Sequence, residues 1–176
     1  MKMFPKLLFI CLLGTIPVAA FAAVESFEGK VVKVIDGDTL QILDNQNSNI
    51  RVRLYGIDAP ESKQAWGQKS KQALSTAVAG KTVKIVNHGP DVYGRELGTI
   101  WLDGYDINAS MVDSGLAWVY RFQDEAVVPS YIKFETGAKN ASLGLWSDKS
   151  PIPPWEWRQI NKKTEKPEKK TPRPNW

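Results

Sequence analysis

The amino-acid sequence predicts a mainly β domain of the α+β class, built on a small closed barrel of five strands. Short segments alternate apolar with polar residues, and one segment of helical spacing stands between the third and the fourth of them. The length of 176 residues, with 43% hydrophobic and 24% charged residues, is that of one ordinary globular domain. Collagen-like, coiled-coil and wholly disordered chains are therefore excluded.

The first three strands are expected within residues 28–55. Their apolar positions are Val31, Val32, Val34 and Ile35, then Leu40 and Ile42, then Ile50, Val52 and Leu54. Asp36-Gly37-Asp38 and residues 44–49 separate them as turns. Two further strands are expected over 82–86 and 97–102, and Asp103-Gly104 ends the second of these with a turn.

Three helices complete the predicted domain. The first is expected over 68–79, where Ala73, Leu74, Ala77 and Val78 recur at helical spacing before Gly80. A short helix capped by Asn108 is expected through Val112, residues 116–120 are expected to be extended, and a third helix is expected over 130–142. Five strands with a helix between the third and the fourth are typical of the oligonucleotide/oligosaccharide-binding (OB) barrel.

The barrel domain is assigned to residues 23–148, and the flanking segments differ from it in composition. Residues 1–22 combine Lys2 and Lys6 with an apolar run over 7–13 and end in Ala20-Phe21-Ala22, the pattern of a cleaved secretory signal peptide. The apolar run is shorter than the roughly 20 residues of a membrane-spanning helix, so no stable membrane anchor is expected. An uncleaved anchor extended to Val18 is the alternative. The mature chain is expected to be secreted or periplasmic.

Residues 149–176 are predicted to be a Pro/Trp-containing linker followed by a basic, disordered tail. From residue 161 onward the tail carries six basic and two acidic residues. The whole chain has a formal net charge of +4, so the body between signal peptide and tail is slightly acidic. A polyanion would have to be bound by local positive charge in the body or by the tail.

The counts of cysteine and histidine exclude several kinds of site. Cys11, the single cysteine, lies in the signal segment, so the mature chain has no disulfide and no cysteine metal ligand. With His88 as the single histidine, a His-rich zinc site and a Ser-His-Asp triad are improbable. The available chemistry therefore uses carboxylates, arginines and hydroxyl groups.

Four carboxylates lie near predicted strand ends: Asp36, Asp38, Asp58 and Glu61. An oxygen set of this kind suits a hard divalent cation, although an Asp-Gly-Asp turn with solvated acids is the alternative. Arg53 alternates with Val52 and Leu54, so its guanidinium points off the core face, within one connection of Asp58 and Glu61. Arg95 begins a strand after the Tyr93-Gly94 turn. A cation beside paired carboxylates suits a phosphate oxygen, and an ordinary surface arginine is the alternative.

Four sequence blocks occur in order. They are Val34-Ile35-Asp36-Gly37-Asp38-Thr39, Arg53-Leu54-Tyr55-Gly56-Ile57-Asp58-Ala59-Pro60-Glu61, Tyr93-Gly94-Arg95 and Gly144-Leu145-Trp146. In these blocks the chain resembles the staphylococcal nuclease, or thermonuclease, family, over about residues 26–148. The resemblance implies a calcium-dependent phosphodiesterase that acts on DNA and RNA, has a barrel with three helices and leaves 3′-phosphate products. We expect it to act as a monomer.

The resemblance also implies roles for individual residues. Asp38, Asp58 and the backbone carbonyl of Ala59 correspond to calcium ligands, and Arg53, Glu61 and Arg95 correspond to the catalytic set. Tyr93 corresponds to a tyrosine that contacts the terminal phosphate, and Asp36 to an acid near the metal. In-line attack of water places negative charge on the phosphoryl oxygens, which arginines and a metal can stabilise while Glu61 acts as general base.

The chain departs from the best-known member at three places. Val92 replaces a basic residue, the loop between Glu61 and Trp66 is shorter, and the aromatic pair around the nucleotide has no clear counterpart. Two alternatives to an enzyme are a non-catalytic nucleic-acid-binding barrel and an oligosaccharide-binding barrel. The first would not need the full set of acids and arginines, and the second would leave them unexplained, so the enzyme is favoured.

Overall fold

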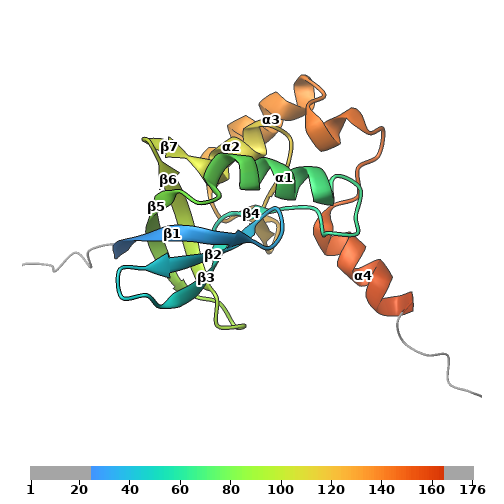
Figure 1. Cartoon of the computed structure of the whole chain (residues 1–176). Coiled ribbons are helices and arrows are strands. Elements are labelled where there is room, and N and C mark those ends of the chain that lie inside the picture. The colour runs from blue at the N-terminus through green and yellow to red at the C-terminus, as the bar shows by residue number, and fades with distance from the viewer. Residues whose placement is uncertain (1–24, 165–176) are drawn as a thin grey trace, which may run out of the picture.

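The five predicted strands form a closed barrel in the computed structural model, which describes residues 25–164. They are β1 (Ser26–Val34), β2 (Thr39–Asp44), β3 (Asn49–Leu54), β5 (Thr82–Pro90) and β6 (Glu96–Leu102). Neighbours pair antiparallel in the order β3-β2-β1-β5-β6, and a parallel pairing of β3 with β6 closes the barrel (Figure 1). The predicted fold class is confirmed.

Alternation along the strands fills the barrel interior. In β3, Val52 and Leu54 are buried, while Arg51 and Arg53, which alternate with them, point away from the barrel interior. The alternation fails in β1, where a register shift after Val31 leaves the side chain of Val32 50% exposed. The largest fully buried side chains include Leu40, Ile42, Leu54, Ile85 and Ile100.

Three helices pack on one side of the barrel, as Figure 1 shows: α1 (Gly67–Val78), α2 (Ile107–Asp113) and α3 (Ile132–Asn140). Their positions agree with the three predicted helices. A 3-10 turn, η1 (Pro129–Tyr131), precedes α3, and η2 (Gly144–Ser147) follows it. The buried side chains of α1 include Leu74 and Val78, which join the hydrophobic core.

The predicted cap of the second helix is wrong. Asp106, not Asn108, is the N-cap of α2, and its carboxylate accepts a hydrogen bond from the backbone N–H of Ala109 at 3.0 Å. Asn108 is instead fully buried. Its amide donates to the carbonyl oxygens of Tyr55 at 2.9 Å and Gly98 at 3.0 Å, and so ties α2 to the barrel.

Short strand pairs lie outside the barrel. β4 (Ile57–Asp58) pairs antiparallel with β8 (Trp118–Val119), with Asp58 opposite Trp118. β7 (Tyr105–Asp106) extends the sheet beside β6, and β9 (Arg121–Phe122) pairs with β10 (Glu125–Ala126). The buried Glu135 of α3 accepts a hydrogen bond from the backbone N–H of Val119 at 3.0 Å. Thus α3 is hydrogen-bonded to β8, and β8 is paired with β4, the strand that carries Asp58.

A fourth helix, α4 (Pro154–Thr164), lies in the segment that the sequence analysis assigned to a linker and tail. The described residues therefore contain four α-helices, one more than predicted. α4 stands apart from the other three helices, on the far side of the loop after β4 (Figure 1). Among residues 25–164, no helix combines the length and apolar character needed to cross a bilayer. The predicted signal peptide and residues 165–176 lie outside the described part of the chain.

Candidate active site

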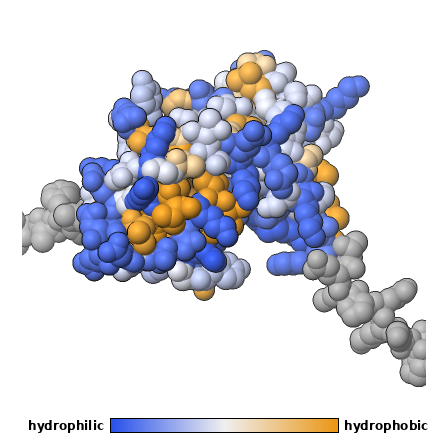
Figure 2. Space-filling model, in the orientation of Figure 1, coloured by the Kyte–Doolittle hydropathy of each residue, from blue (hydrophilic) through white to orange (hydrophobic). Residues whose placement is uncertain are grey.

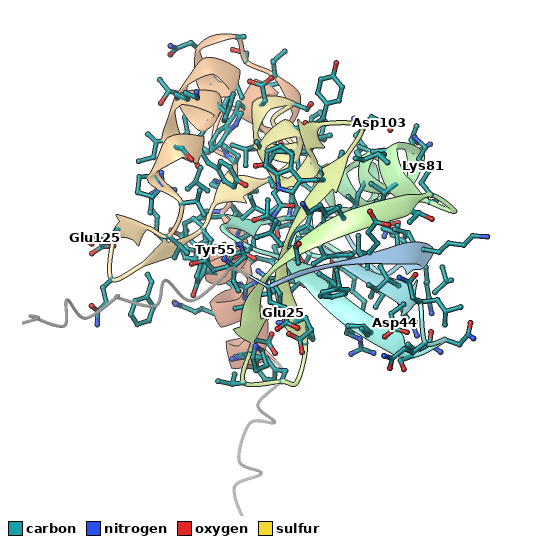
Figure 3. The ribbon with its side chains drawn as sticks, turned by 90° about the vertical axis from the view of Figure 1, so that its left-hand side faces the viewer. Glu25, Asp44, Tyr55, Lys81, Asp103 and Glu125 are labelled. Atoms are coloured by element: carbon teal, nitrogen blue, oxygen red, sulfur yellow. The ribbon has the colours of Figure 1, made fainter. Side chains whose placement is uncertain are left out.

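One cleft of about 830 Å³ gathers most of the predicted site residues. Its lining includes Asp36, Asp38, Arg53, Ala59, Glu61, Tyr93 and Arg95. Tyr55, which also lines it, lies well away from the turns at Asp44 and Lys81 (Figure 3). Figure 2 shows a hollow between the barrel and α4, bordered by hydrophilic residues. The cleft therefore opens at one end of the barrel.

A tight turn delivers Asp38 to this cleft. The carboxylate of Asp36 accepts a hydrogen bond from the backbone N–H of Asp38 at 3.1 Å. Gly37 between them lies against α1, and a Cβ there would stand 2.1 Å from the Ser70 hydroxyl oxygen. Any side chain at position 37 would therefore push the turn away from the helix. The Asp-Gly-Asp pattern encodes this close approach rather than a freely solvated turn.

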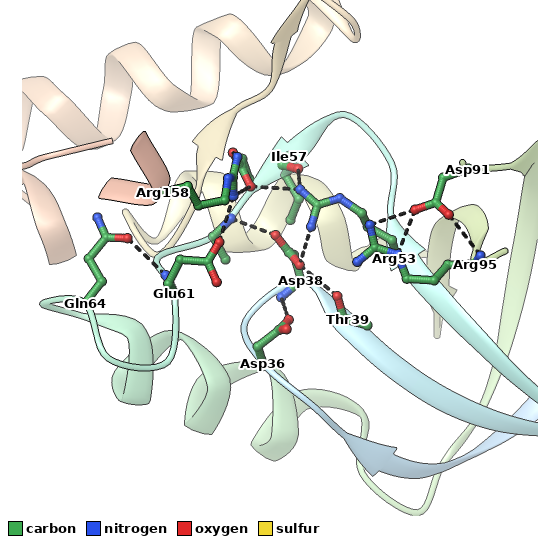
Figure 4. A network of polar contacts seen from close by, with 12 residues as sticks. Asp36, Asp38, Thr39, Arg53, Ile57, Glu61, Gln64, Asp91, Arg95 and Arg158 are labelled. Carbon is green, nitrogen blue, oxygen red and sulfur yellow. Dashed lines mark hydrogen bonds and ion pairs between the residues drawn. The ribbon is translucent and has the colours of Figure 1, made fainter. Parts of the chain in front are cut away.

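Arg53 joins the two buried aspartates. Its Nη1 atom lies 2.7 Å from Asp38 Oδ1 and its Nη2 atom lies 2.8 Å from Asp58 Oδ1 (Figure 4). Asp38 also accepts from the backbone N–H of Ala59 at 2.9 Å and from the hydroxyl of Thr39 at 2.9 Å. The predicted calcium ligands Asp38, Asp58 and Ala59 are therefore neighbours in space, brought together from two separate segments of the chain.

The electrostatic state of this group favours a further positive charge. Burial raises the pKa of Asp38 to about 7, and the nearby carboxylates of Asp36 and Asp58 add to the rise while Arg53 opposes it. The contact with Arg53 thus does not fully compensate the burial of Asp38. A bound cation would lower the pKa of Asp38 again and hold the carboxylate ionised.

The donor set fits a hard cation by its chemistry. Asp38 and Asp58 supply carboxylate oxygens, and the peptide of Ala59 lies against Asp38. Across residues 25–164 no cluster of three or more acidic, histidine or cysteine side chains surrounds one point. Protein side chains would therefore supply two ligands, and water or substrate the remainder. Such an open oxygen set suits a hard divalent cation that keeps several positions for water or substrate.

The loop that follows β4 positions Glu61. The backbone N–H of Glu61 donates to the side-chain oxygen of Gln64 at 3.0 Å, and the backbone N–H of Gln64 donates to the Glu61 carbonyl at 2.8 Å. At Gly67, a Cβ would stand only 1.9 Å from that carbonyl oxygen. The glycine thus allows α1 to begin directly against the loop. The Glu61 carboxylate faces the cleft (Figure 4).

Arg95 enters the cleft from the hairpin between β5 and β6. Its Nε and Nη2 atoms each lie 2.7 Å from Asp91 Oδ2, and its backbone N–H donates to Asp91 Oδ1 at 2.9 Å. Burial alone would raise the pKa of Asp91, but its hydrogen bonds with Arg95 and Tyr93 lower it overall. The Tyr93 ring is 81% exposed and lies 5.5 Å from the Arg95 guanidinium. Asp91 therefore fixes the direction of Arg95.

Three residues of this network were not identified from the sequence: Gln64, Asp91 and Arg158. Asp91 had a local signal, because it stands four residues before Arg95 and two before Tyr93 in a turn-forming segment. Gln64 had none beyond its place in the short loop. Arg158 comes from α4, and it contacts both Asp58 and Glu61 (Figure 4).

Comparison with known proteins gives consistent results. A family model described as "Staphylococcal nuclease homologue" matches residues 51–148. Protein ParB of Escherichia coli is 40% identical over 151 residues, which cover 81% of this chain and 85% of that protein. An uncharacterized endonuclease of Haemophilus influenzae is 40% identical over 157 residues, 89% of this chain and 87% of its own length. Micrococcal nuclease of Shigella flexneri is 39% identical over 145 residues, with 77% and 83% covered.

Proposed function

The chain belongs to the staphylococcal nuclease family, and we propose from this membership that it is an exported, calcium-dependent endonuclease that hydrolyses DNA and RNA. The observation that carries the proposal is that Asp38, Arg53, Glu61 and Arg95 line one cleft, while the fully buried Asp58 contacts Arg53 behind its lining. An arginine pair and a carboxylate base are the groups that phosphodiester hydrolysis needs, and a binding module has no need to place them together.

The two arginines stabilise the negative charge that develops on the phosphoryl oxygens. A guanidinium has five N–H donors. Arg53 uses three contacts on Asp38, Asp58 and the carbonyl of Ile57, and Arg95 uses Nε and Nη2 on Asp91. Both side chains line the cleft, so donors remain for a phosphate. Their internal carboxylate partners hold each planar group in one orientation before substrate arrives.

Glu61 takes the proton of the attacking water. A carboxylate is a weak base for water, so much of the rate must come from orientation of the water. The hydrogen bonds of the loop through Gln64 hold its backbone in place. Asp38, Asp58 and the Ala59 carbonyl would hold calcium, which when bound supplies positive charge to the phosphodiester. Attack on phosphorus with departure of the 5′-oxygen leaves 3′-phosphate ends.

Export is supported by the signal-peptide pattern of residues 1–22. Cleavage near Ala22 would remove the single cysteine, which agrees with a mature chain that needs no disulfide. Fractionation of cells that produce the full chain, followed by N-terminal sequencing of the mature protein, tests this part. A mature protein that retains Met1 and stays in the cytosol would contradict it.

Digestion of end-labelled single- and double-stranded DNA by the mature chain tests the proposed chemistry. We expect cleavage in calcium, much slower cleavage in magnesium, none in chelator, and 3′-phosphate ends on the products. Glu61→Gln should bind DNA but lose at least about 100-fold in rate. Equal rates in the two metals would refute the calcium assignment. Binding without any cleavage under all conditions would favour the non-catalytic barrel instead.

A further inference from the structure

The segment that leads into α4 packs on the loop that carries Glu61. The indole Nε1 of Trp66 donates to Asp148 Oδ2 at 3.0 Å. The side-chain amide of Gln64 donates to the carbonyl oxygen of Ile152 at 2.5 Å. Since Gln64 also binds the backbone of Glu61, one side chain connects the C-terminal segment to that residue.

The first turn of α4 is fixed by packing and by its own sequence. Pro154 is the first helical residue, where a missing N–H has no cost. Pro154 is buried, and the half-buried Trp155 places its ring edge to face against that of Trp118, with centroids 6.5 Å apart. Trp118 belongs to β8, which pairs with the strand that carries Asp58. The start of α4 is therefore anchored to the same substructure as the predicted metal ligands.

This anchored helix places Arg158 directly on two site carboxylates. Its Nη2 atom lies 2.7 Å from Asp58 Oδ2, and its Nη1 atom lies 2.8 Å from Glu61 Oε1 and 3.2 Å from Asp58 Oδ1 (Figure 4). Asp58 is fully buried, and its Oδ1 atom also receives Arg53. Both carboxylate oxygens of Asp58, a predicted calcium ligand, are therefore bound by guanidinium groups, those of Arg53 and Arg158.

A divalent cation at Asp58 would need the electron pairs and the space that Arg158 uses, and the two positive charges would repel each other. Arg158 lies outside residues 51–148, the segment that the family model matches. Its side chain is 38% exposed and lines the cleft, so its guanidinium can exchange a carboxylate contact for water.

We propose that the Arg158 guanidinium occupies the predicted metal site in the metal-free protein. There it pairs with Asp58 and Glu61, and it competes with the divalent cation for these two carboxylates. This inference rests on the proposed calcium-dependent function. Calcium then binds only to the fraction of molecules in which Arg158 has released Asp58, and its apparent affinity is lowered by that fraction. α4 thereby sets the calcium concentration at which the nuclease site is loaded.

Calcium titration by calorimetry of the full mature chain, freed of metal, tests the competition without any nuclease assay. Arg158→Gln should bind calcium at least about tenfold more tightly than the natural chain, because the competing charge is removed. Calcium should also raise the melting temperature of this variant by more than it raises that of the natural chain. Arg158→Lys, which keeps the charge but loses the two-pronged contact, should lie between the two in affinity.

Lys162→Gln is the matched control, because it removes the same charge from an exposed position one turn further along α4. Its calcium affinity should stay within about twofold of the natural value. Equal or weaker calcium binding by Arg158→Gln would overturn the competition, as would an equal gain in Lys162→Gln. If Arg158→Gln does not fold, Arg158→Lys decides, and an unchanged affinity overturns the inference. If no protein binds calcium, the calcium-dependent function fails together with it.

Discussion

Replacement of Glu135 by glutamine tests whether α3 stabilises the strand pair that carries Asp58. The Glu135 carboxylate is 2% exposed and lies 2.7 Å from Arg121 Nη2, 2.8 Å from Lys139 Nζ and 3.0 Å from the Val119 backbone nitrogen. Glutamine can keep the bond from Val119, but its NH₂ group would face the two cations. The loss of two charge-assisted bonds, one of them to a half-exposed lysine, should cost about 2–4 kcal/mol.

The same substitution should change the dependence of stability on pH. Burial alone raises the pKa of Glu135, but hydrogen bonds from Arg121, Lys139 and Val119 outweigh it and lower the pKa from the ordinary 4.5. A group with a lowered folded-state pKa stabilises the fold above its unfolded pKa, and this contribution is lost as pH falls through the folded value. The free-energy difference between the natural chain and Glu135→Gln should therefore shrink as the solution is acidified below about pH 4.5.

Urea unfolding followed by far-UV circular dichroism measures both effects. Glu125→Gln, at an exposed glutamate of β10, is the control and should change the free energy of unfolding by less than about 0.5 kcal/mol. A loss below about 1 kcal/mol in Glu135→Gln at neutral pH would refute the role of the buried carboxylate. A difference from the natural chain that stays constant between about pH 3 and pH 7 would refute the reasoning on its pKa.

Three further predictions follow from the site and its surroundings. Arg53→Lys and Arg95→Lys should each lower turnover on labelled DNA by about 100-fold or more, because an ammonium cannot contact two phosphate oxygens in one plane, and near-native rates would contradict this. Asn108→Ala should cost about 2–4 kcal/mol in urea unfolding, because it leaves buried backbone groups of the barrel unpaired; a cost under about 1 kcal/mol would show that water replaces the amide. Truncation after Thr164 should leave turnover on short oligonucleotides intact. For binding to long DNA, the slope of log affinity against log salt concentration should become less steep by about 0.9 for each lost phosphate contact. An identical slope in the truncated chain would indicate a tail without a binding role.

The parts of the fold that local sequence determines could be predicted. The barrel strands carry their own alternation and turn signals, and α1 carries its own apolar spacing, so each could be located from a few neighbouring residues. The predicted cap of α2 is wrong because two suitable residues, Asp106 and Asn108, stand only two positions apart at its start. Only the packing of α2 on the barrel decides between them, since it needs the Asn108 amide in the interior.

The helix α4 could not be predicted for a related reason. Its sequence is rich in charged residues after a Pro-rich entry, which resembles a linker, and its position depends on Trp155 meeting Trp118 from a distant part of the chain. The residues that contact the site from distant parts of the chain could not be predicted from the sequence for the same reason. Arg158 and Asp58 are a hundred residues apart, and no spacing rule joins them. Conversely, the long block from Arg53 to Glu61 places its residues within one connection, which is why their proximity could be foreseen.

The parallel pairing of β3 with β6 determines when, during folding, the proposed nuclease site forms. Arg53 lies in this seam, opposite Leu97, and Arg95 stands just before β6 begins. Until the seam closes, the groups proposed for catalysis belong to separate stretches of chain, and the cleft does not exist. Closure of the barrel and formation of the proposed active site are therefore one event, so a chain that is held unfolded would have no nuclease activity.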